Sequence, residues 1–236
     1  MPAGEKLAAM NTLAATTPDS IKVYSPLGLA FYDALIMNGV APHIWGCSAQ
    51  RLVDHYREHV TANHADVGVG TGYCLDHAGL PGEHPRLALI DLQPHCLNYT
   101  ARRLARYRPQ SHRRDVLQPV RGIGPAFDSI ALNGVLHCLS GDLRDKARVF
   151  DHLAPLARPG TKIFGCTLVS DDIATRWRRR AVHGLLNQLR LIDNRRDLVA
   201  DLRTALEARY VDCQIHIVGC MALFSAIVPG TTSVNE

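Results

Sequence analysis

Hydrophobic residues along this chain follow two spacings in turn. Short runs of consecutive apolar residues predict buried strands, and apolar residues three or four positions apart predict helices between them. The predicted strands are Ala65 to Val67, Arg86 to Asp91, His112 to Val116, Phe127 to Asn133 and Lys162 to Val169. Strands that alternate with helices in this way form a parallel sheet with helices on both faces.

Helical spacing begins ahead of the first strand. Apolar residues recur at that spacing from Leu27 to Ile36 and from Ala49 to Val60, which predicts two N-terminal helices. Pro94 suits the first turn of a helix from Pro94 to Tyr107, because the N–H that proline lacks has no helical partner there. Helices are therefore expected before the sheet as well as on its faces.

The end of the chain has a different pattern. A predicted helix from Asp197 to Arg209 is followed by the strand-like runs "VDCQIHIVG" and "CMALFSAIV", with almost nothing between them. Two strands joined by so short a turn must be antiparallel. The predicted fold class is α/β: a doubly wound, seven-stranded, mostly parallel sheet with an antiparallel last strand.

Length and composition fit one domain. The 236 residues, 47% of them hydrophobic, suffice for one well-buried α/β domain, which we place at residues 21–230 with extra N-terminal helices over residues 25–60. We expect residues 1–20, which are rich in alanine and threonine, to form a mobile leader.

Charge and cysteine content narrow the partners. The net charge is only +4, and four of the 26 basic residues are lysines, so no lysine-rich arm for nucleic acid is indicated. The seven cysteines show no zinc spacing, and their odd number argues against a disulfide framework. No signal-peptide pattern is present, and no apolar run approaches the roughly 20 residues of a membrane span. We expect a soluble, cytoplasmic protein with no membrane or nucleic-acid partner, and the sequence leaves a homodimer open.

One stretch, "HADVGVGTGYCLDHAG", points to a ligand. It places Gly68, Gly70 and Gly72 at alternate positions between a predicted strand and a possible helix. Such glycines let a phosphate or amino-acid group approach the main chain, although a plain tight turn has the same pattern. Asp91 ends the next strand about 20 residues later, where a carboxylate can accept hydrogen bonds from both ribose hydroxyls. These features suit either a nicotinamide cofactor or S-adenosylmethionine.

Three details favour S-adenosylmethionine. The dinucleotide pattern G-x-G-x-x-G requires a glycine where Tyr73 stands, and Gly72 falls one position early. Asp66 adds a carboxylate that is poorly placed for a pyrophosphate and well placed for a cationic amino-acid group. Asp115, at the end of the predicted third strand, can accept the exocyclic amine of adenine.

The ordered set "DVGVGTG", "LALIDLQPHCL", "RRDVLQP", "FDSIALNGVLHCL" and "LARPGTKIFG", with the antiparallel last strand, closely resembles the class I S-adenosylmethionine-dependent methyltransferases. The resemblance covers about residues 20 to 228 and implies their Rossmann-like fold. "VYSPLGLAFYDALI" and "HIWGC" look like small-molecule methyltransferases of secondary metabolism, some of which act on indole-like or other aromatic heterocycles. Methylation of a small aromatic or heteroaromatic acceptor, at carbon, nitrogen or oxygen, is therefore implied.

The same resemblance implies which residues bind the cofactor. Asp66 and the three glycines would surround the methionine part, and Asn133 would lie near the sulfonium. The ribose would be held by Asp91 with Leu92, and the adenine framed by Asp115 with Val116.

Methyl transfer is an in-line displacement, so positioning of the acceptor supplies most of the rate. A protonated acceptor also needs a base, and the candidates are His137, His43 and Tyr24. His137 could equally be a structural residue beside the cofactor. Tyr24 and Trp45 are candidate aromatic walls of the acceptor pocket, or else core residues of the N-terminal helices.

A helix at about residues 171–190 is predicted to lie over the sheet as a lid. Its predicted apolar face consists of Ile173, Trp177, Ala181, Leu185 and Leu189, with Arg178, Arg179 and Arg180 pointing largely elsewhere. Trp177 is accordingly a candidate acceptor contact. The arginine run is more typical of a solvated helix face than of an RNA site. Among the 12 histidines we find no H-E-x-x-H or comparable ligand pair, so no metal is predicted.

Three alternatives remain. An RNA or protein methyltransferase would usually carry an added recognition module, for which the sequence leaves no room. A non-catalytic S-adenosylmethionine-binding protein would share the fold without turnover. A Rossmann dehydrogenase would bind NADH instead.

Overall fold

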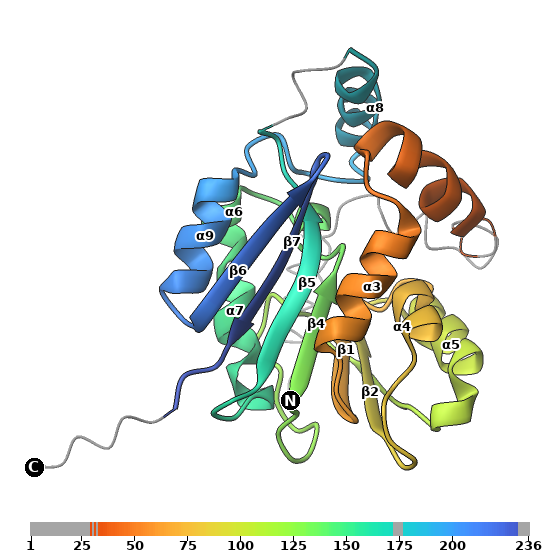
Figure 1. Cartoon of the computed structure of the whole chain (residues 1–236), viewed down its shortest axis with the longest axis vertical. Helices are drawn as coiled ribbons and strands as arrows, with labels where there is room; N and C mark the ends of the chain where they lie inside the picture. The colour runs from red at the N-terminus through yellow and green to blue at the C-terminus, as the bar shows by residue number, and fades with distance from the viewer. Residues whose placement is uncertain (1–28, 30, 32, 172–176, 231–236) are drawn as a thin grey trace, which may run out of the picture.

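The computed structural model describes residues 29, 31, 33–171 and 177–230. Its centre is one seven-stranded sheet in the order β3-β2-β1-β4-β5-β7-β6 (Figure 1). The strands are β1 (Asn63–Val67), β2 (Arg86–Asp91), β3 (Gln110–Arg113), β4 (Ser129–Asn133), β5 (Lys162–Leu168), β6 (Val211–Val218) and β7 (Met221–Ile227). The first five pair in parallel, and β7 pairs antiparallel with both β5 and β6. The predicted doubly wound sheet with one reversed strand is confirmed.

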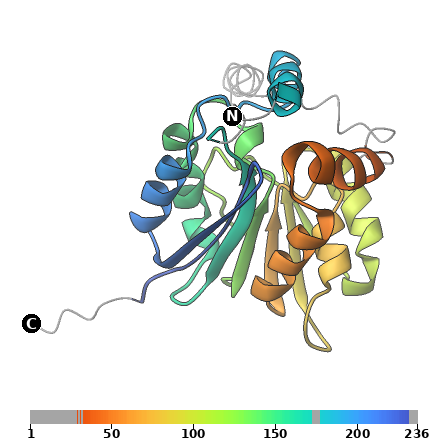
Figure 2. The ribbon, with the colours of Figure 1, turned by 45° about the horizontal axis from the view of Figure 1, so that its top comes forward.

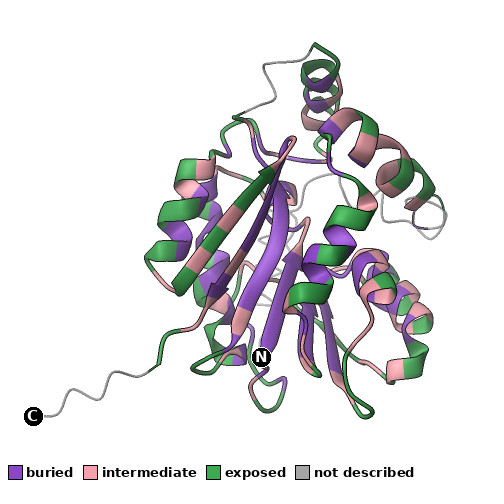
Figure 3. Cartoon of the chain, viewed as in Figure 1, coloured by how far each residue is buried: buried purple, intermediate pink, exposed green. Residues whose placement is uncertain are grey.

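Helices cover both faces of the sheet. One face carries α3 (Ala49–His59), α4 (Tyr73–Ala78), α5 (Pro94–Arg103) and the short η3 (Ala105–Tyr107). The other carries η4 (Leu136–Cys138), α6 (Leu143–Lys146), α7 (Arg148–Leu153), η5 (Ala154–Leu156) and α9 (Val199–Glu207). Strands β1, β2, β4 and β5 are almost wholly buried between these layers, whereas the edge strand β6 is largely exposed (Figure 3).

Two further helices lie beyond the end of the sheet at which β5 leads out (Figures 1 and 2). They are η2 (Asp33–Trp45), which has π-type hydrogen bonding, and α8 (Trp177–Gln188). They contact each other, and the Arg179 Nε donates a hydrogen bond to the Ile44 carbonyl over 3.0 Å. We call this pair the cover.

The turn between β6 and β7 reaches this cover. The Cys220 N–H donates to the Trp45 carbonyl over 2.8 Å, and the Val169 N–H donates to the Cys220 carbonyl over 2.9 Å. Gly219 has φ of +61°, and a Cβ there would collide with the Trp45 carbonyl oxygen. Only glycine allows the turn to pass so close to Trp45.

The N-terminal helices differ from the prediction. The structure continues η2 to Trp45, although Gly39 and Pro42 predict an end near Ile36. Contacts with α3 and α8 outweigh those local preferences. The expected leader, residues 1–20, lies outside the described residues.

The prediction of which face of the lid helix is apolar and buried is wrong. Trp177 is 70% exposed and Leu185 54%, while Arg179 and His183 are the buried residues of α8. Contacts of these two polar side chains with the rest of the chain decide which face of α8 turns inward, against the periodicity of its apolar residues. Ile173 lies outside the described residues.

No helix within the described residues is long and apolar enough to cross a membrane.

Candidate cofactor and acceptor site

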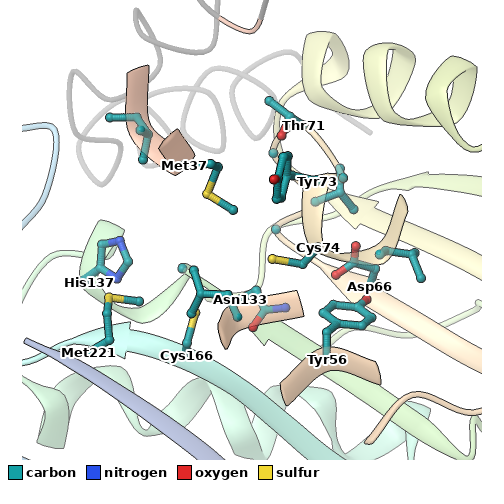
Figure 4. Close-up of a pocket in the computed structure, with 18 of the residues that line it drawn as sticks. Met37, Tyr56, Asp66, Thr71, Tyr73, Cys74, Asn133, His137, Cys166 and Met221 are labelled. Carbon is teal, nitrogen blue, oxygen red and sulfur yellow. The ribbon is translucent and has the colours of Figure 1, made fainter. Parts of the chain in front are cut away.

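A cavity of about 110 Å³ lies where β1 and β4 end, beneath the cover (Figure 4). The turn after β1 supplies one wall, and η2, α3, β5 and β7 supply the other sides. Most of its wall is apolar, with polar groups from Asp66, Asn133 and His137. Lining residues that the sequence analysis did not single out are Ile36, Met37, Leu52, Tyr56, Val69, Thr71, Tyr73, Cys74, Leu75, Gly134, Cys166 and Met221.

The three glycines of the turn have positive φ values of +67° at Gly68, +50° at Gly70 and +69° at Gly72. A Cβ at Gly68 would collide with Val135, and one at Gly72 would lie 2.6 Å from the Thr100 side chain. At Gly70, by contrast, no atom lies within 4 Å of the Cβ position. Gly68 and Gly72 are thus required by protein packing, and Gly70 leaves open space at the cavity.

Asp66 ends up at the cavity with its carboxyl group beside the Tyr56 hydroxyl (Figure 4). It is only 5% exposed. Burial raises the pKa of Asp66 to about 8, and the nearby Asp91 acts in the same direction.

Asp91 lies beside the glycine turn but does not line the cavity. Its Oδ1 accepts the Gln93 N–H over 2.8 Å. Burial raises its pKa, against the lowering effect of hydrogen bonds from the backbone N–H groups of Gln93, Gly70 and Val69. Its neighbour Leu92 accepts a hydrogen bond from Arg113 through its carbonyl.

Asp115 is not at the end of a strand as predicted, because β3 stops at Arg113. The Asp115 Oδ1 instead accepts the Leu117 N–H over 2.9 Å, which forms a local turn. Val116 is partly buried, and its carbonyl bonds to His152. Neither residue lines the cavity.

Two buried donors at the cavity have no hydrogen-bond partner within the described part of the chain. They are the Asn133 Nδ2 and the Trp45 Nε1. An unpaired buried donor costs about 1–3 kcal/mol, which a bound acceptor group would recover. This finding points to a ligand with oxygen atoms at both positions.

His137 lines the cavity and is 7% exposed. Burial lowers its pKa to about 3, so the ring is neutral. The Leu168 N–H donates to the His137 Nδ1 over 3.2 Å, so Nδ1 carries no proton. The proton of a neutral imidazole must then be on Nε2.

A network that the sequence analysis missed joins the cover to the glycine turn. Asp33 on η2 accepts hydrogen bonds from the Thr71 hydroxyl over 2.7 Å and from Arg103 over 2.6 Å. Arg103 also binds Asp76 on α4 over 2.8 Å. In the sequence, Asp33 is 38 positions from Thr71 and 70 positions from Arg103, so only the fold brings them together.

Two other predicted site residues, Trp177 and His43, are not brought to the cavity. Trp177 is exposed at the start of α8, and His43 is exposed on η2. Neither is among the lining residues, because both side chains are on the outward side of the cover. Tyr24 lies outside the described residues.

A side-chain cluster on α3 lies away from the cavity. His55, Glu58 and His59 present nitrogen and oxygen atoms within 4.8 Å of one another. The sequence pattern is H-x-x-E-H, a known metal-ligand spacing, so the expectation that no comparable ligand pair occurs is wrong. The His55 Nε2 lies 3.1 Å from the Phe224 carbonyl.

The fold, with the glycine turn and two carboxylates at the ends of adjacent strands, defines a class I S-adenosylmethionine-dependent methyltransferase. A family model described as a methyltransferase domain matches residues 65–163. The chain is 35% identical over 203 residues to demethylluteothin O-methyltransferase of Streptomyces thioluteus, covering 86% of this chain and 88% of that protein. It is 29% identical over 216 residues to a physcion biosynthesis cluster O-methyltransferase of Aspergillus chevalieri, covering 90% and 96%.

Solved structures agree on the fold. A DhpI complex with S-adenosylhomocysteine has a TM-score of 0.63 at 14% identity, covering 90% of this chain and 96% of that chain. Human N-acetylserotonin methyltransferase with S-adenosylmethionine has a TM-score of 0.58 at 15% identity. The match covers 89% of this chain and 58% of the human chain. The chain belongs to the S-adenosylmethionine-dependent methyltransferases that act on small molecules of secondary metabolism.

Proposed function

We propose that the protein methylates an oxygen of a small aromatic or heteroaromatic molecule, and that this oxygen is already ionised when it binds. The observation that carries this proposal is the state of the titratable groups in the cavity. Oxygen is chosen because three of the relatives are O-methyltransferases by name, against one N-methyltransferase.

No described side chain in the cavity is suited to act as a general base. The Nδ1 lone pair of His137 is occupied by the Leu168 N–H, and Nε2 carries a proton. Burial raises the pKa values of the Cys74 and Cys166 thiols. Asp66, once paired with a cationic cofactor, would be a carboxylate of ordinary strength, which is too weak to deprotonate an alcohol. An acceptor hydroxyl that ionises by itself near neutrality avoids this requirement.

We assign His137 the role of hydrogen-bond donor instead of base. Its Nε2–H can donate to the acceptor oxygen and hold it in line with the methyl group. Asn133 and Trp45 offer further donors to ligand oxygens. The remaining polar groups serve the cofactor in this proposal: Asp66 and Gly70 at the methionine end, Asp91 with Leu92 at the ribose, and Asp115 with Val116 at the adenine.

In this proposal the cover acts as a lid that excludes water from the cavity. Arg179 is committed to the cover through its bond to Ile44, so the arginine run is in part structural, which disfavours an RNA substrate. We further propose a cytoplasmic protein, because the seven cysteines are odd in number and show no zinc spacing. That nucleic acid is no partner stays a prediction, and a homodimer stays open.

A series of phenols of graded acidity tests the ionised-acceptor proposal. With saturating S-adenosylmethionine, methylated product is measured by mass spectrometry between pH 6 and pH 9. The midpoint of each rate profile should follow the pKa of the phenol used. A single midpoint shared by all acceptors would show that a group on the enzyme takes the proton, and the proposal would be wrong.

Two variants of His137 separate a donor from a base. His137→Gln keeps an N–H donor and should retain most of kcat, whereas His137→Ala should lose about 10- to 100-fold, as expected for a hydrogen bond to a charged group. If His137 were the base, both variants would lose about 10²- to 10⁴-fold together.

A further inference from the structure

A chain of polar side chains leads from the cavity into the core. The Asp66 carboxyl group contacts the Tyr56 hydroxyl, which is 2.7 Å from the His64 Nε2. The His64 Nδ1 is 2.8 Å from the Ser129 Oγ. That oxygen lies 2.9 Å from the Thr61 Oγ1, at the opposite end of β1 from the cavity. His64 and Ser129 have no exposed surface.

The far end of this chain fixes the direction of its hydrogen bonds. The Thr61 hydroxyl donates its one proton to the Asn63 carbonyl over 3.2 Å. The Ser129 Oγ accepts the Thr61 N–H over 3.0 Å, and with the Thr61 proton on Asn63 the Ser129 hydroxyl donates to the Thr61 Oγ1. Since the Ser129 proton is used there, the His64 Nδ1–H must donate to the Ser129 Oγ.

The same argument continues to the cavity. Burial lowers the pKa of His64 to about 3, so the ring is neutral and its Nε2 carries no proton. The Tyr56 hydroxyl must then donate to the His64 Nε2. The Tyr56 oxygen can only accept a hydrogen bond from Asp66, which requires a proton on the Asp66 carboxyl group.

We propose that the chain of Tyr56, His64, Ser129 and Thr61 holds Asp66 protonated in the cofactor-free protein, and that S-adenosylmethionine binding releases this proton to solvent. The proposal rests on the assignment of Asp66 to the cofactor site. His64, Ser129 and Thr61 do not line the cavity, and Tyr56, which does, acts in this account through its contact with Asp66. They are positioning residues that act through Asp66.

The groups around Asp66 agree with a bound proton. Tyr56 faces it from α3, Asp91 from β2 and Cys74 from α4. None of these is a cation. Burial, the largest effect, and Asp91 raise the pKa of Asp66 and outweigh the hydrogen bond of Tyr56, which lowers it. The positive charge of S-adenosylmethionine reverses this balance, because a cation within about 4–6 Å favours the carboxylate.

The proton balance is simple. One proton leaves Asp66 and appears in the buffer, the carboxylate pairs with the cofactor, and His64 stays neutral. Because binding requires the ionised carboxylate, cofactor affinity should increase up to about tenfold for each pH unit between pH 6 and pH 8. Above about pH 8, where Asp66 is ionised before binding, the dependence should level off.

Calorimetry with S-adenosylmethionine alone tests the release. Binding enthalpies at pH 7 are measured in phosphate and in Tris, which differ in ionisation enthalpy and so report the number of protons released. Wild type should release close to one proton, and Asp66→Asn should release none. Equal enthalpies in the two buffers for wild type, or release that persists in Asp66→Asn, would overturn the proposal. Because no acceptor is present, this result does not depend on whether the acceptor proposal holds.

The far end of the chain provides the sharper test. In Thr61→Val, the Ser129 hydroxyl is free to donate to His64, whose proton moves to Nε2, and Tyr56 then donates to an Asp66 carboxylate. Proton release should fall by at least half in Thr61→Val and remain as in wild type in Thr61→Ser, which keeps the hydroxyl. Thr61→Val keeps the size of the side chain without the hydroxyl, and Thr61→Ser keeps the hydroxyl without the methyl group. Unchanged release in a folded Thr61→Val variant would show that the chain does not control Asp66.

Discussion

The two sides of the cavity differ in what lines them, mainly backbone on one side and side chains on the other. The side that we assign to the cofactor consists of backbone with positive φ at the glycine turn and of the carboxyl group of Asp66. The opposite side includes the flexible side chains of Met37 and Met221 (Figure 4), and the aromatic Trp45 also lines the cavity. A backbone wall admits one ligand shape, whereas methionine side chains adapt to several. The comparison teaches that the site fixes the methyl donor and leaves the acceptor side adjustable.

The first prediction concerns low pH, which acts on buried histidines in both parts of the molecule. Burial lowers to about 3 or 4 the pKa values of four histidines: His64, in the chain that leads from Asp66, His55 on α3 away from the cavity, and His137 and His183 near the cover. Their folded-state pKa values lie below the unfolded value of 6.5, so they stabilise the fold above pH 6.5, and this stability is lost as the pH falls. The pKa values of Asp66 and Asp197 are raised to about 8 and about 6. These two groups therefore bind protons in the folded state and offset part of this loss of stability.

Near pH 5.5 the unfolded state should bind about two more protons than the folded state. The free energy of unfolding should therefore fall by roughly 3 kcal/mol for each pH unit of acidification. Urea unfolding at pH 7 and pH 5.5 measures this slope. His183→Asn should reduce the slope by about one proton, and His84→Asn, at an exposed position, should not. An equal slope in all three proteins would contradict the account.

The second prediction breaks the cofactor side alone. Gly70→Val places a branched side chain in the open space at the turn, and S-adenosylmethionine affinity should fall at least about 100-fold by calorimetry. Gly122→Val is the matched control, because Gly122 also has positive φ and open space but lies away from the cavity. Its backbone strain should lower stability similarly and leave affinity unchanged. Equal loss of affinity in both would mean that strain, not ligand contact, explains Gly70.

The third prediction weakens the link between the two sides. Asp33→Asn removes the charge that joins η2 to Thr71 and Arg103, groups that are about one-fifth exposed. Because solvent screens such pairs, cofactor affinity should fall only about fivefold, or roughly 1 kcal/mol. Asp54→Asn removes a comparable charge from an exposed ion pair with Arg57 and should leave affinity unchanged. An unchanged affinity in Asp33→Asn as well would show that the cover does not influence the cofactor side.

Much of the fold follows from local pattern. Strand β2 has the predicted bounds Arg86–Asp91, and the reversed β7 follows from the short connection after β6. Glycine positions at the turn were also predictable, because positive φ is a backbone requirement that the sequence displays directly. What was not predictable depends on tertiary contacts. Asp33 meets Arg103 across 70 residues, and α8 buries Arg179 in place of Trp177, since the partner of each lies elsewhere in the chain.

The site residues divide in the same way. Asp66 and Gly70 were found from spacing, and the cavity contains both. The protonation state of His137 could not be found, because it depends on the N–H of Leu168, 31 residues away. Met37 and Met221 gave no signal, since a methionine in an apolar run has no pattern that distinguishes a pocket wall from core.

The hairpin turn at Gly219 has a consequence for biosynthesis. Trp45 and Met37, near the start of the described chain, form the acceptor wall together with Met221, which is made about 180 residues later. Chains fold during synthesis at about 5–20 residues per second, so the glycine turn and the first five strands can form well before the hairpin emerges from the ribosome. Until then the Trp45 carbonyl lacks its bond from Cys220, and the last wall of the cavity is missing. A nascent chain could therefore gain a cofactor site before it gains an acceptor site, which would delay methylation until β7 is in place.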